Sequence, residues 1–260
     1  MSGAIFVKRY DDPERCAAAA AHHTWLAGLG SGVRLPALVA QGVRHLIFER
    51  LPGHTPKTGD LPRAAAALGR LHAAAHRGEL QAASLDQPHL TSTGLVIPDF
   101  ASPRQGALHR AAAASGVHGS TIDAVLDRAG QPAAFYKDPN IRNYLADGDD
   151  VAVVDFDDMT LAPFGYDLAG LLVTASMTHG RLNEQTLAHC LHAYRVVVAP
   201  QLCSLANLKQ YAELHHLLTV RYLGRNGYRH PWPTVRPWPD PFPAEPTREG
   251  ALGWPPRPNS

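Results

Sequence analysis

The chain has 260 residues, a formal net charge of +1 and 18% charged residues. This length allows one large domain or two small lobes with an ample core, and the nearly balanced charge gives no sign of a nucleic acid or a membrane surface as partner. The three cysteines are far apart without a C-x-x-C pair, and no apolar run is long enough to cross a membrane. We therefore expect a cytoplasmic protein with reduced thiols and no signal peptide.

The first elements predicted along the chain are a strand and a helix. Residues 4–10 read as a β-strand that carries Lys8 near its end, and residues 13–29 follow as an alanine-rich helix. The helix contains His22 and His23, a pair that invites a metal-site interpretation. Adjacent residues point in different directions on a helix, so we interpret them as surface or partly packed histidines instead.

Two strands and a long helix are predicted next. Residues 33–51 contain two short apolar segments that are joined by a turn-like Gln41-Gly42. Beyond Pro56 the spacing of the apolar residues changes from two to about 3.6, which indicates a helix with Pro62 in its first turn.

The following region is less regular. We interpret His72, within the long helix, as a packed or capping residue rather than a catalyst. Residues 80–103 are irregular and contain Pro and Ser, and a helix is predicted from about 104 to 114. Another helix begins at Ser120, where Ser120 and Asp123 resemble a capping box.

The polar loop YKDPNIRN follows this helix and begins the stretch on which the functional interpretation depends. It carries Asp138 and, five positions later, Asn143, and a hairpin-type turn then precedes the β-branched run 151–154, which delivers Asp155 at its end. A helix with Asp167 near its start comes next. Asp and Asn often form turns, but turns do not explain an Asp at the end of a buried strand. Two carboxylates and an amide brought together in this way can hold a hard divalent cation and a hydroxyl against a polyphosphate.

This spacing, with a strand that ends in Asp and a helix that opens in Asp-Leu-Ala, resembles the signature of the aminoglycoside phosphotransferase and choline kinase group. These enzymes are small-molecule relatives of the protein kinases. The resemblance implies that Asp138 is the catalytic-loop base that accepts the proton of the substrate hydroxyl. It also implies that Asn143 and Asp155 are ligands of Mg²⁺, and that Asp167 is a structural residue that braces the loop.

The resemblance extends to the N-terminal strands. Lys8 matches the Lys that reaches the α- and β-phosphates of the nucleotide, a role suited to a point charge on a long stem. The backbone carbonyl of Glu49 and the amide of Leu51 match the groups that hydrogen-bond adenine. Two plainer alternatives stay open here: a solvated Lys at a strand edge, and an edge strand that ends in a Pro-Gly turn.

Three departures from the family pattern accompany the resemblance. Tyr136 and Lys137 stand where the family has His and Gly, which leaves Asp138 in register. Only seven residues precede Lys8, so we expect the chain to lack the Gly-rich hairpin that covers the phosphates. The first helix offers only Glu14, near its start, in place of the mid-helix Glu that pairs with the Lys.

Three charged residues near the loop leave alternatives open. Arg142 could neutralise the migrating phosphoryl group, because this kind of catalysis relies on fixed positive charge, or it could pin a carboxylate in the loop. Asp157 and Asp158 follow the metal-ligand candidate closely. One of them could be a second metal ligand or contact a cationic substrate, or both could be solvent-facing acids in a turn.

The remainder of the chain is predicted to be helical up to a proline-rich tail. Helices are expected over 168–177, 183–198 and 204–224, and His215 and His216 are interpreted as part of a mixed helix face.

The tail from residue 230 is rich in Pro and Trp, a composition that argues against helix and favours extended structure. Trp232 and Trp238 argue against a purely solvated segment. We therefore predict that residues 230–243 lie across the helical lobe and that the last ten residues are loose. A partner-binding Pro-rich segment is the alternative.

Taken together, these features predict an α+β, protein-kinase-like fold with two lobes: a reduced antiparallel sheet lobe in residues 1–53 and a mostly helical lobe in 54–229, followed by the tail 230–260. The expected activity is transfer of the terminal phosphate of ATP or GTP, with Mg²⁺, to a hydroxyl of a small polar molecule. An antibiotic, in resistance or biosynthesis, is one such acceptor. Asp138 and Arg142 would be the catalytic residues.

Two rival interpretations remain. One is a catalytically silent relative that binds a nucleotide or another ligand. The other is an active enzyme in which another chain, the substrate or the tail replaces the missing hairpin.

Overall fold

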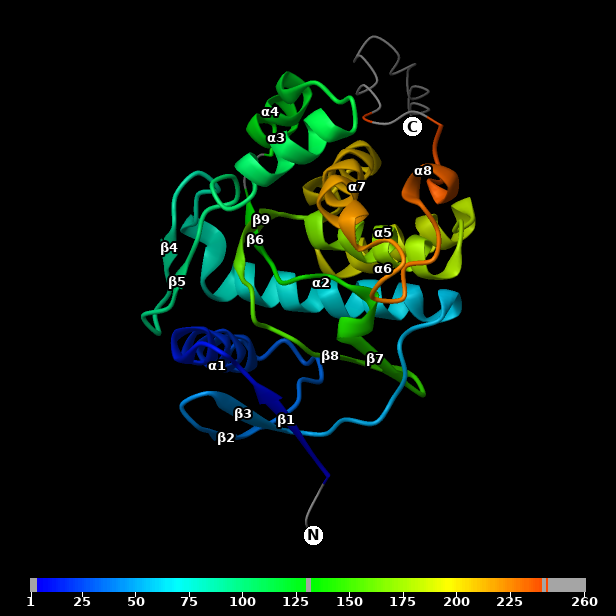
Figure 1. The fold of residues 1–260 in the computed structure, drawn as a ribbon. Coiled ribbons are helices and arrows are strands. Elements are labelled where there is room, and N and C mark those ends of the chain that lie inside the picture. The colour runs from blue at the N-terminus through cyan, green and yellow to red at the C-terminus, as the bar shows by residue number, and fades with distance from the viewer. Residues whose placement is uncertain (1–3, 130–131, 240–241, 243–260) are drawn as a thin grey trace, which may run out of the picture.

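The computed structural model describes residues 4–129, 132–239 and 242. Figure 1 shows a small N-terminal lobe, in blue, on one side of the long helix α2 and a cluster of helices on its other side. No helix in the described part of the chain is long and apolar enough to cross a membrane.

The N-terminal lobe is a three-stranded antiparallel sheet, in the order β1-β3-β2, with one helix. Its elements are β1 (Ile5–Arg9), α1 (Pro13–Gly28), β2 (Leu38–Gln41) and β3 (His45–Glu49). Helix α1 begins where the Asp12 side chain accepts a hydrogen bond from the backbone N–H of Glu14, and proline occupies its first position. A small apolar core, which includes Leu46 and Phe48, lies between the sheet and α1.

The larger lobe is mostly helical. Its helices are α2 (Leu61–Gly78), α3 (Gln105–Ala114), α4 (Gly119–Asp127), α5 (Tyr166–His179), α6 (Glu184–Val197), α7 (Leu205–Thr219) and α8 (Trp232–Val235). Short 3-10 helices are η1 (Thr58–Asp60), η2 (Leu80–Ala82), η3 (Ile141–Asn143), η4 (Pro200–Leu202) and η5 (Val220–Tyr222). The two-stranded pairs are β4 (His89–Leu90) with β5 (Val96–Ile97), β6 (Ala133–Tyr136) with β9 (Thr160–Pro163), and β7 (Tyr144–Asp147) with β8 (Asp150–Val153).

The core of this lobe is built around α5. Every residue of α5 from Tyr166 to Met177 is buried, as expected for a helix that is covered on all sides. Helix α2 packs along α6, and α5 packs along α7. The loops that leave β6 and β8 are therefore anchored to a rigid helical base. The two lobes join where His54 forms a β-bridge with Ala146 of strand β7.

The predicted hairpin is confirmed. Strands β7 and β8 pair in antiparallel register, with Tyr144 opposite Val153, and Gly148 occupies the turn with a φ of 57°. The backbone N–H of Val154 donates a hydrogen bond of 2.9 Å to the carbonyl of Asn143. Asn143 and the residue after Val154 are consequently held side by side at the open end of the hairpin.

Two local predictions are wrong. Ser120 and Asp123 do not form a capping box, because α4 begins one residue earlier with His118 as its N-cap and has no side-chain cap. Asp123 instead accepts a hydrogen bond of 2.7 Å from His109 Nε2. The region 80–103 is also not wholly irregular, since it contains the short strands β4 and β5.

The tail packs on the helical lobe over its described residues, as predicted. Trp232 and Trp238 are buried, and the indole N–H of each donates a hydrogen bond to Glu213 of α7. The expectation that proline excludes helix here is wrong, because α8 forms one turn with Pro233 near its start, where a missing N–H costs no hydrogen bond. The prediction for the last ten residues lies outside the described residues.

Candidate active site

Two cavities meet at the open end of the β7–β8 hairpin. The first, of about 410 Å³, lies between the lobes and is lined by Lys8, Glu49 and Leu51. The second, of about 820 Å³, is lined by the loop after β6 and by α7, and Asp138 lies in it. Asn143 and Asp155 line both cavities. These two residues therefore stand at the junction.

Asp138 and Asn143 are in direct contact. The side-chain amide of Asn143 donates hydrogen bonds to the Asp138 carbonyl at 2.9 Å and to its carboxylate at 3.4 Å. The side-chain oxygen of Asn143 has no hydrogen-bond partner within the described part of the chain. The amide thus orients the Asp138 carboxylate and keeps its own oxygen available as a ligand.

The backbone is strained at both aspartates. Asp138 has a φ of 38° and Asp155 a φ of 66°, a region that non-glycine residues rarely adopt, although Asp tolerates it better than most. Such conformations cost on the order of 1–3 kcal/mol each and cluster at functional sites. Both aspartates line the second cavity, and Asp155 also lines the first.

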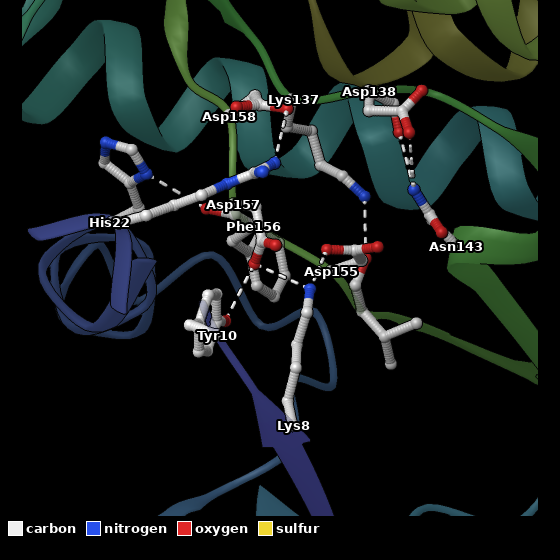
Figure 2. A network of polar contacts seen from close by, with 12 residues as sticks. Lys8, Tyr10, His22, Lys137, Asp138, Asn143, Asp155, Phe156, Asp157 and Asp158 are labelled. Carbon is white, nitrogen blue, oxygen red and sulfur yellow. Dashed lines mark hydrogen bonds and ion pairs between the residues drawn. The ribbon is translucent and has the colours of Figure 1, made fainter. Parts of the chain in front are cut away.

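Lys8 reaches this junction from strand β1. Its Nζ forms ion pairs of 2.5 Å with Asp155 and 2.6 Å with Asp157, and the Tyr10 hydroxyl donates to Asp157 at 2.9 Å (Figure 2). Burial lowers the pKa of Lys8, but its hydrogen bonds to the two aspartates outweigh burial, so the pKa is raised above its usual value. The partners of Lys8 therefore come from the loop after β8. Glu14, the only candidate in the helix, forms no ion pair with it among the described contacts.

Lys137 is a second cation at the site, and it is completely buried. Its Nζ donates a hydrogen bond of 2.9 Å to the carbonyl of Val154 and lies over the rings of Phe156 and Tyr144, at 5.0 and 5.2 Å from their centroids. Burial lowers the pKa of Lys137 to about 8, against the opposing charge of Asp138. Lys137 thus links the loop after β6 to the loop after β8 (Figure 2). Sequence reasoning noted this residue only as a departure from the family pattern.

Asp167 lies below the same loop. Its carboxylate accepts a hydrogen bond of 3.1 Å from the backbone N–H of Lys137, and it is fully buried. His72 is also fully buried, with its Nδ1 at 2.7 Å from the Tyr194 hydroxyl, so it is a packed residue as predicted. The position of Asp167 is the one that bracing of the catalytic loop requires.

The raised pKa of Asp138 suits an acid–base role. The side chain lines the second cavity, but the protein around it removes much of its hydration, and this desolvation raises the pKa of the carboxyl. The charge of Lys137 lowers the pKa, and the charge of Asp155 raises it further. A carboxylate with a pKa nearer neutrality is a better general base than an ordinary Asp.

His22 and His23 are buried, which differs from the expected surface or partly packed positions. His22 Nδ1 lies 3.0 Å from the carbonyl of Phe156, and His23 Nε2 lies 2.7 Å from that of Pro36, so each imidazole N–H is used as a donor. Burial lowers the pKa of both histidines. Within the described residues no group of three His, Cys, Asp or Glu side chains could hold a metal, and His22 instead fixes the loop that carries Asp155.

On the nucleotide side, the residues predicted to bind adenine lie at the first cavity. Glu49 and Leu51 both line it, and the Leu51 N–H has no hydrogen-bond partner among the described residues. Phe48 and Val154 give the cavity apolar walls. None of the described tail residues lines this cavity, so the structure does not favour the tail as a cover for the phosphates.

The three remaining charged candidates lie in the second cavity. Arg142 is exposed there and forms no salt bridge with any described residue. The alternative in which Arg142 pins a carboxylate of the loop is therefore not supported. Asp157 is bound to Lys8, and Asp158 forms an exposed pair with Arg15 at 3.8 Å.

Comparisons of sequence and structure show which known proteins the chain resembles. A family model described as "Phosphotransferase enzyme family" matches residues 2–203. No curated protein sequence matches the chain significantly. Among solved structures, a putative fructosamine-3-kinase from Thermobifida fusca has a TM-score of 0.56 at 20% identity, over 90% of this chain and 84% of that one.

Two further structures are similar over most of their length. The gentamicin complex of the aminoglycoside phosphotransferase APH(2")-IIa has a TM-score of 0.56 at 14% identity, over 85% of this chain and 79% of that one. The macrolide 2'-phosphotransferase MphH from Brachybacterium faecium has a TM-score of 0.52 at 17% identity, over 92% and 86%. These likenesses show the fold: the predicted α+β, protein-kinase-like arrangement is confirmed.

Proposed function

Because the chain belongs to the phosphotransferase enzyme family and is a small-molecule kinase, we propose that it moves the terminal phosphate of ATP or GTP to a hydroxyl of a small polar molecule. The observation that carries this proposal is the meeting of two cavities at Asn143 and Asp155. A nucleotide in the first cavity and an acceptor in the second would meet at those two residues.

The nucleotide would bind between the lobes. Leu51 and Glu49 would offer backbone groups to the base, and Phe48 and Val154 would pack on its faces. Lys8 would bind the phosphates, since it lines this cavity and its Nζ lies 2.5 Å from Asp155, a candidate magnesium ligand. A nucleoside triphosphate donor fits the cytoplasmic location predicted from the sequence.

Magnesium would be held by Asn143 and Asp155. The donor set fits, because the side-chain oxygen of Asn143 has no partner among the residues that the structure describes, and one carboxylate oxygen of Asp155 is outside the ion pair with Lys8. One or two protein oxygens plus phosphate oxygens is the usual coordination of Mg²⁺. When bound, the ion would neutralise the charge of the phosphates.

Asp138 would act on the acceptor. Its carboxylate lies in the second cavity beside the junction, oriented by Asn143. It would position the acceptor hydroxyl and accept its proton as the phosphorus–oxygen bond forms. Arg142 would neutralise charge on the transferring group, since it lines the same cavity without a salt-bridge partner among the described residues.

An antibiotic is one acceptor class to include, for resistance or for biosynthesis. Some structures of this fold are described as complexes with gentamicin or with amicoumacin. A catalytically silent binding protein is the alternative function. The strained backbone at Asp138 and Asp155 speaks against it, because a silent protein gains nothing from that cost.

The test is a screen of candidate acceptors with Mg²⁺ and either ATP or GTP, read by the mass shift of the acceptor, with Asp138→Ala as the blank. Thermal stabilisation by nucleotide and Mg²⁺ is measured in parallel, with Asp155→Ala as its control. We expect a phosphorylated acceptor with the unchanged chain alone. Nucleotide-dependent stabilisation without any phosphorylated acceptor in a broad screen would support the silent alternative instead.

A further inference from the structure

Arg104 is a buried cation without a counter-ion in the wall of the second cavity. Only 5% of the residue is exposed, and its guanidinium donates to the carbonyl of Phe100 at 2.6 Å and to the hydroxyl of Thr160 at 2.5 Å. Three aromatic rings surround it; the nearest, that of Tyr136, has its centroid 4.6 Å from Cζ. No carboxylate of the described residues lies within salt-bridge distance of it. A buried charge is normally paired, so this arrangement lacks an anion.

One partly buried arginine of the chain does have a carboxylate partner. Arg236, whose side chain is 14% exposed, has Glu213 as an ion-pair partner at 3.5 Å. Arg104 differs because it faces a cavity in which a ligand can supply the missing charge. A guanidinium has five N–H donors, and the two neutral acceptors found here leave several of them for a ligand.

His215 is a second buried polar group of the same wall. It is 5% exposed, and neither of its ring nitrogens has a hydrogen-bond partner within the described residues. Burial and the charge of Arg104 lower the pKa of His215 to about 3, so the imidazole is neutral and carries one N–H. Its ring centroid lies 5.8 Å from that of Tyr136, the same ring that faces Arg104. Arg104 and His215 therefore contact the same ring.

The charges that line this cavity are separated by sign. The acids, Asp138, Asp155, Asp157 and Asp158, all belong to the two loops at the junction. Arg142 belongs to the loop of Asp138, whereas Arg104 and Arg221 line the cavity from other segments. Neither Arg104 nor Arg221 forms a salt bridge with a described residue. The wall at Arg104 and Arg221 is therefore positive, without a carboxylate partner among the described residues.

We propose that the acceptor molecule carries an anionic group, a carboxylate or a phosphate monoester, which binds at Arg104 while its hydroxyl lies at Asp138. This inference rests on the proposed function of the site. A planar guanidinium matches both anions with paired hydrogen bonds. A cationic group of the acceptor would meet like charge at Arg104 and Arg221.

The experiment uses four six-carbon compounds that differ in charge: glucose, gluconate, glucose 6-phosphate and glucosamine. Binding to the full chain is measured by ligand-observed NMR titration, with and without a non-hydrolysable nucleotide. We expect the two anionic compounds to bind with a Kd about tenfold lower than glucose, and glucosamine to bind most weakly. The gluconate and glucose 6-phosphate titrations distinguish a carboxylate from a phosphate.

Arg104→Gln should reduce the preference for the anionic compounds to less than about twofold. Arg110→Gln, an exposed arginine on the same helix, is the matched control and should leave it unchanged. Since Arg104 is buried, its variant is checked for folding by thermal melting. Arg221→Glu, at an exposed position of the same cavity, gives a second test and should weaken the anionic compounds about tenfold.

The inference is overturned if glucose or glucosamine binds as well as the anionic compounds, if none of the four binds, or if both Arg variants keep the preference. Because binding is read without turnover, the outcomes separate the two proposals. Anionic compounds that bind but are never phosphorylated would leave the subsite in place and contradict the proposed transfer. Phosphorylation of neutral or cationic acceptors alone would support the proposed transfer and contradict the anionic subsite.

Discussion

Two carboxylates with raised pKa values, Asp138 and Glu213, have opposite surroundings. Glu213 is 3% exposed and accepts hydrogen bonds from the indole N–H groups of Trp232 and Trp238, with Arg236 as its ion-pair partner at 3.5 Å. Burial raises its pKa in spite of these partners. Its oxygens are saturated by the protein, so Glu213 has a structural role: it fastens the tail to α7.

Asp138 is arranged in the contrary manner. It is open to a cavity, its backbone is strained, and the hydrogen bond that its carboxylate receives from Asn143 is long, at 3.4 Å. The comparison shows how a structural carboxylate differs from one that is available for a reaction. A structural carboxylate is saturated inside the protein, whereas a carboxylate kept for a reaction retains hydrogen-bonding capacity toward a cavity.

The largest expected effect is on activity at Asp138. Asp138→Asn keeps the shape of the side chain and removes the base, so kcat should fall about 10³-fold, equivalent to a barrier about 4 kcal/mol higher. The melting temperature should stay within about 2 °C, because the carboxylate is not saturated by the protein. Steady-state kinetics and thermal melting check both values. Activity within tenfold of the unchanged chain would contradict the role of Asp138.

Glu213→Ala should give the opposite signature. It removes a buried acceptor from two indole groups and leaves Arg236 without its partner, so unfolding free energy should fall by about 3 kcal/mol. Urea denaturation measures this, with Glu184→Ala, an exposed acid of α6, as the control. A loss of less than about 1 kcal/mol would show that the cluster is not structural.

The pH dependence of Glu213 sharpens the same point. Its pKa in the folded protein is raised above the ordinary value of 4.5, so the folded state holds the proton more tightly than the unfolded state. Stability should therefore fall as pH rises from 4.5 through the raised pKa and then level off. Glu213→Gln should lack this fall. If the unfolding free energies of the unchanged chain and of Glu213→Gln change in parallel between acid and neutral pH, the raised pKa of Glu213 is contradicted.

Substitution of Lys137 tests whether this buried cation supports activity or only the stability of the fold. Lys137→Met should lower kcat about tenfold, because the loop of Asp138 loses its link to the Val154 carbonyl. The KM for nucleotide should be unchanged, since Lys137 does not line the first cavity.

A pH titration gives Lys137 a second readout. Its folded pKa of about 8 lies below the ordinary 10.5, so the unfolded chain binds the extra proton between these values. The stability of the unchanged chain relative to Lys137→Met should therefore rise from pH 8 to 10.5. A constant difference between the two denaturation curves would count against a buried charged Lys.

The smallest effect is expected at Trp238. Trp238→Phe keeps an aromatic ring but removes the N–H that donates to Glu213 at 2.9 Å, so stability should fall by about 1 kcal/mol. Denaturation of this variant shows whether saturation of Glu213, rather than apolar packing, carries the effect. No measurable change would assign the tail contact to packing alone.

The sequence was most informative where local signals are strong. A Gly-containing turn between β-branched residues predicts the hairpin that sets Asn143 beside Asp155. The spacing of Asp138, Asn143 and Asp155 predicts the fold through its resemblance to a family. The long helices follow from apolar periodicity, because their cores repeat every three or four residues.

Contacts between distant segments escaped prediction. Nothing local shows that Lys137 is buried, since its surroundings come from residues up to 19 positions away. The partners of Lys8 are 147 and 149 positions distant, and they replace the helix Glu that the family pattern led us to seek. Arg104 and His215 lie on separate helices that meet only in the folded chain. A polar residue within an otherwise apolar helix face, as at His215, is the one signal that could have marked them.

Helix α7 has one further consequence. Glu213 of this helix accepts the indole N–H groups of the tail, and two residues later His215 lines the cavity proposed for the acceptor. Helix α7 therefore carries both the residue that anchors the tail and a residue of the proposed acceptor site. We therefore expect substitutions in the tail to shift α7 and so to change the relative affinities for different acceptors, without altering any residue that touches the acceptor.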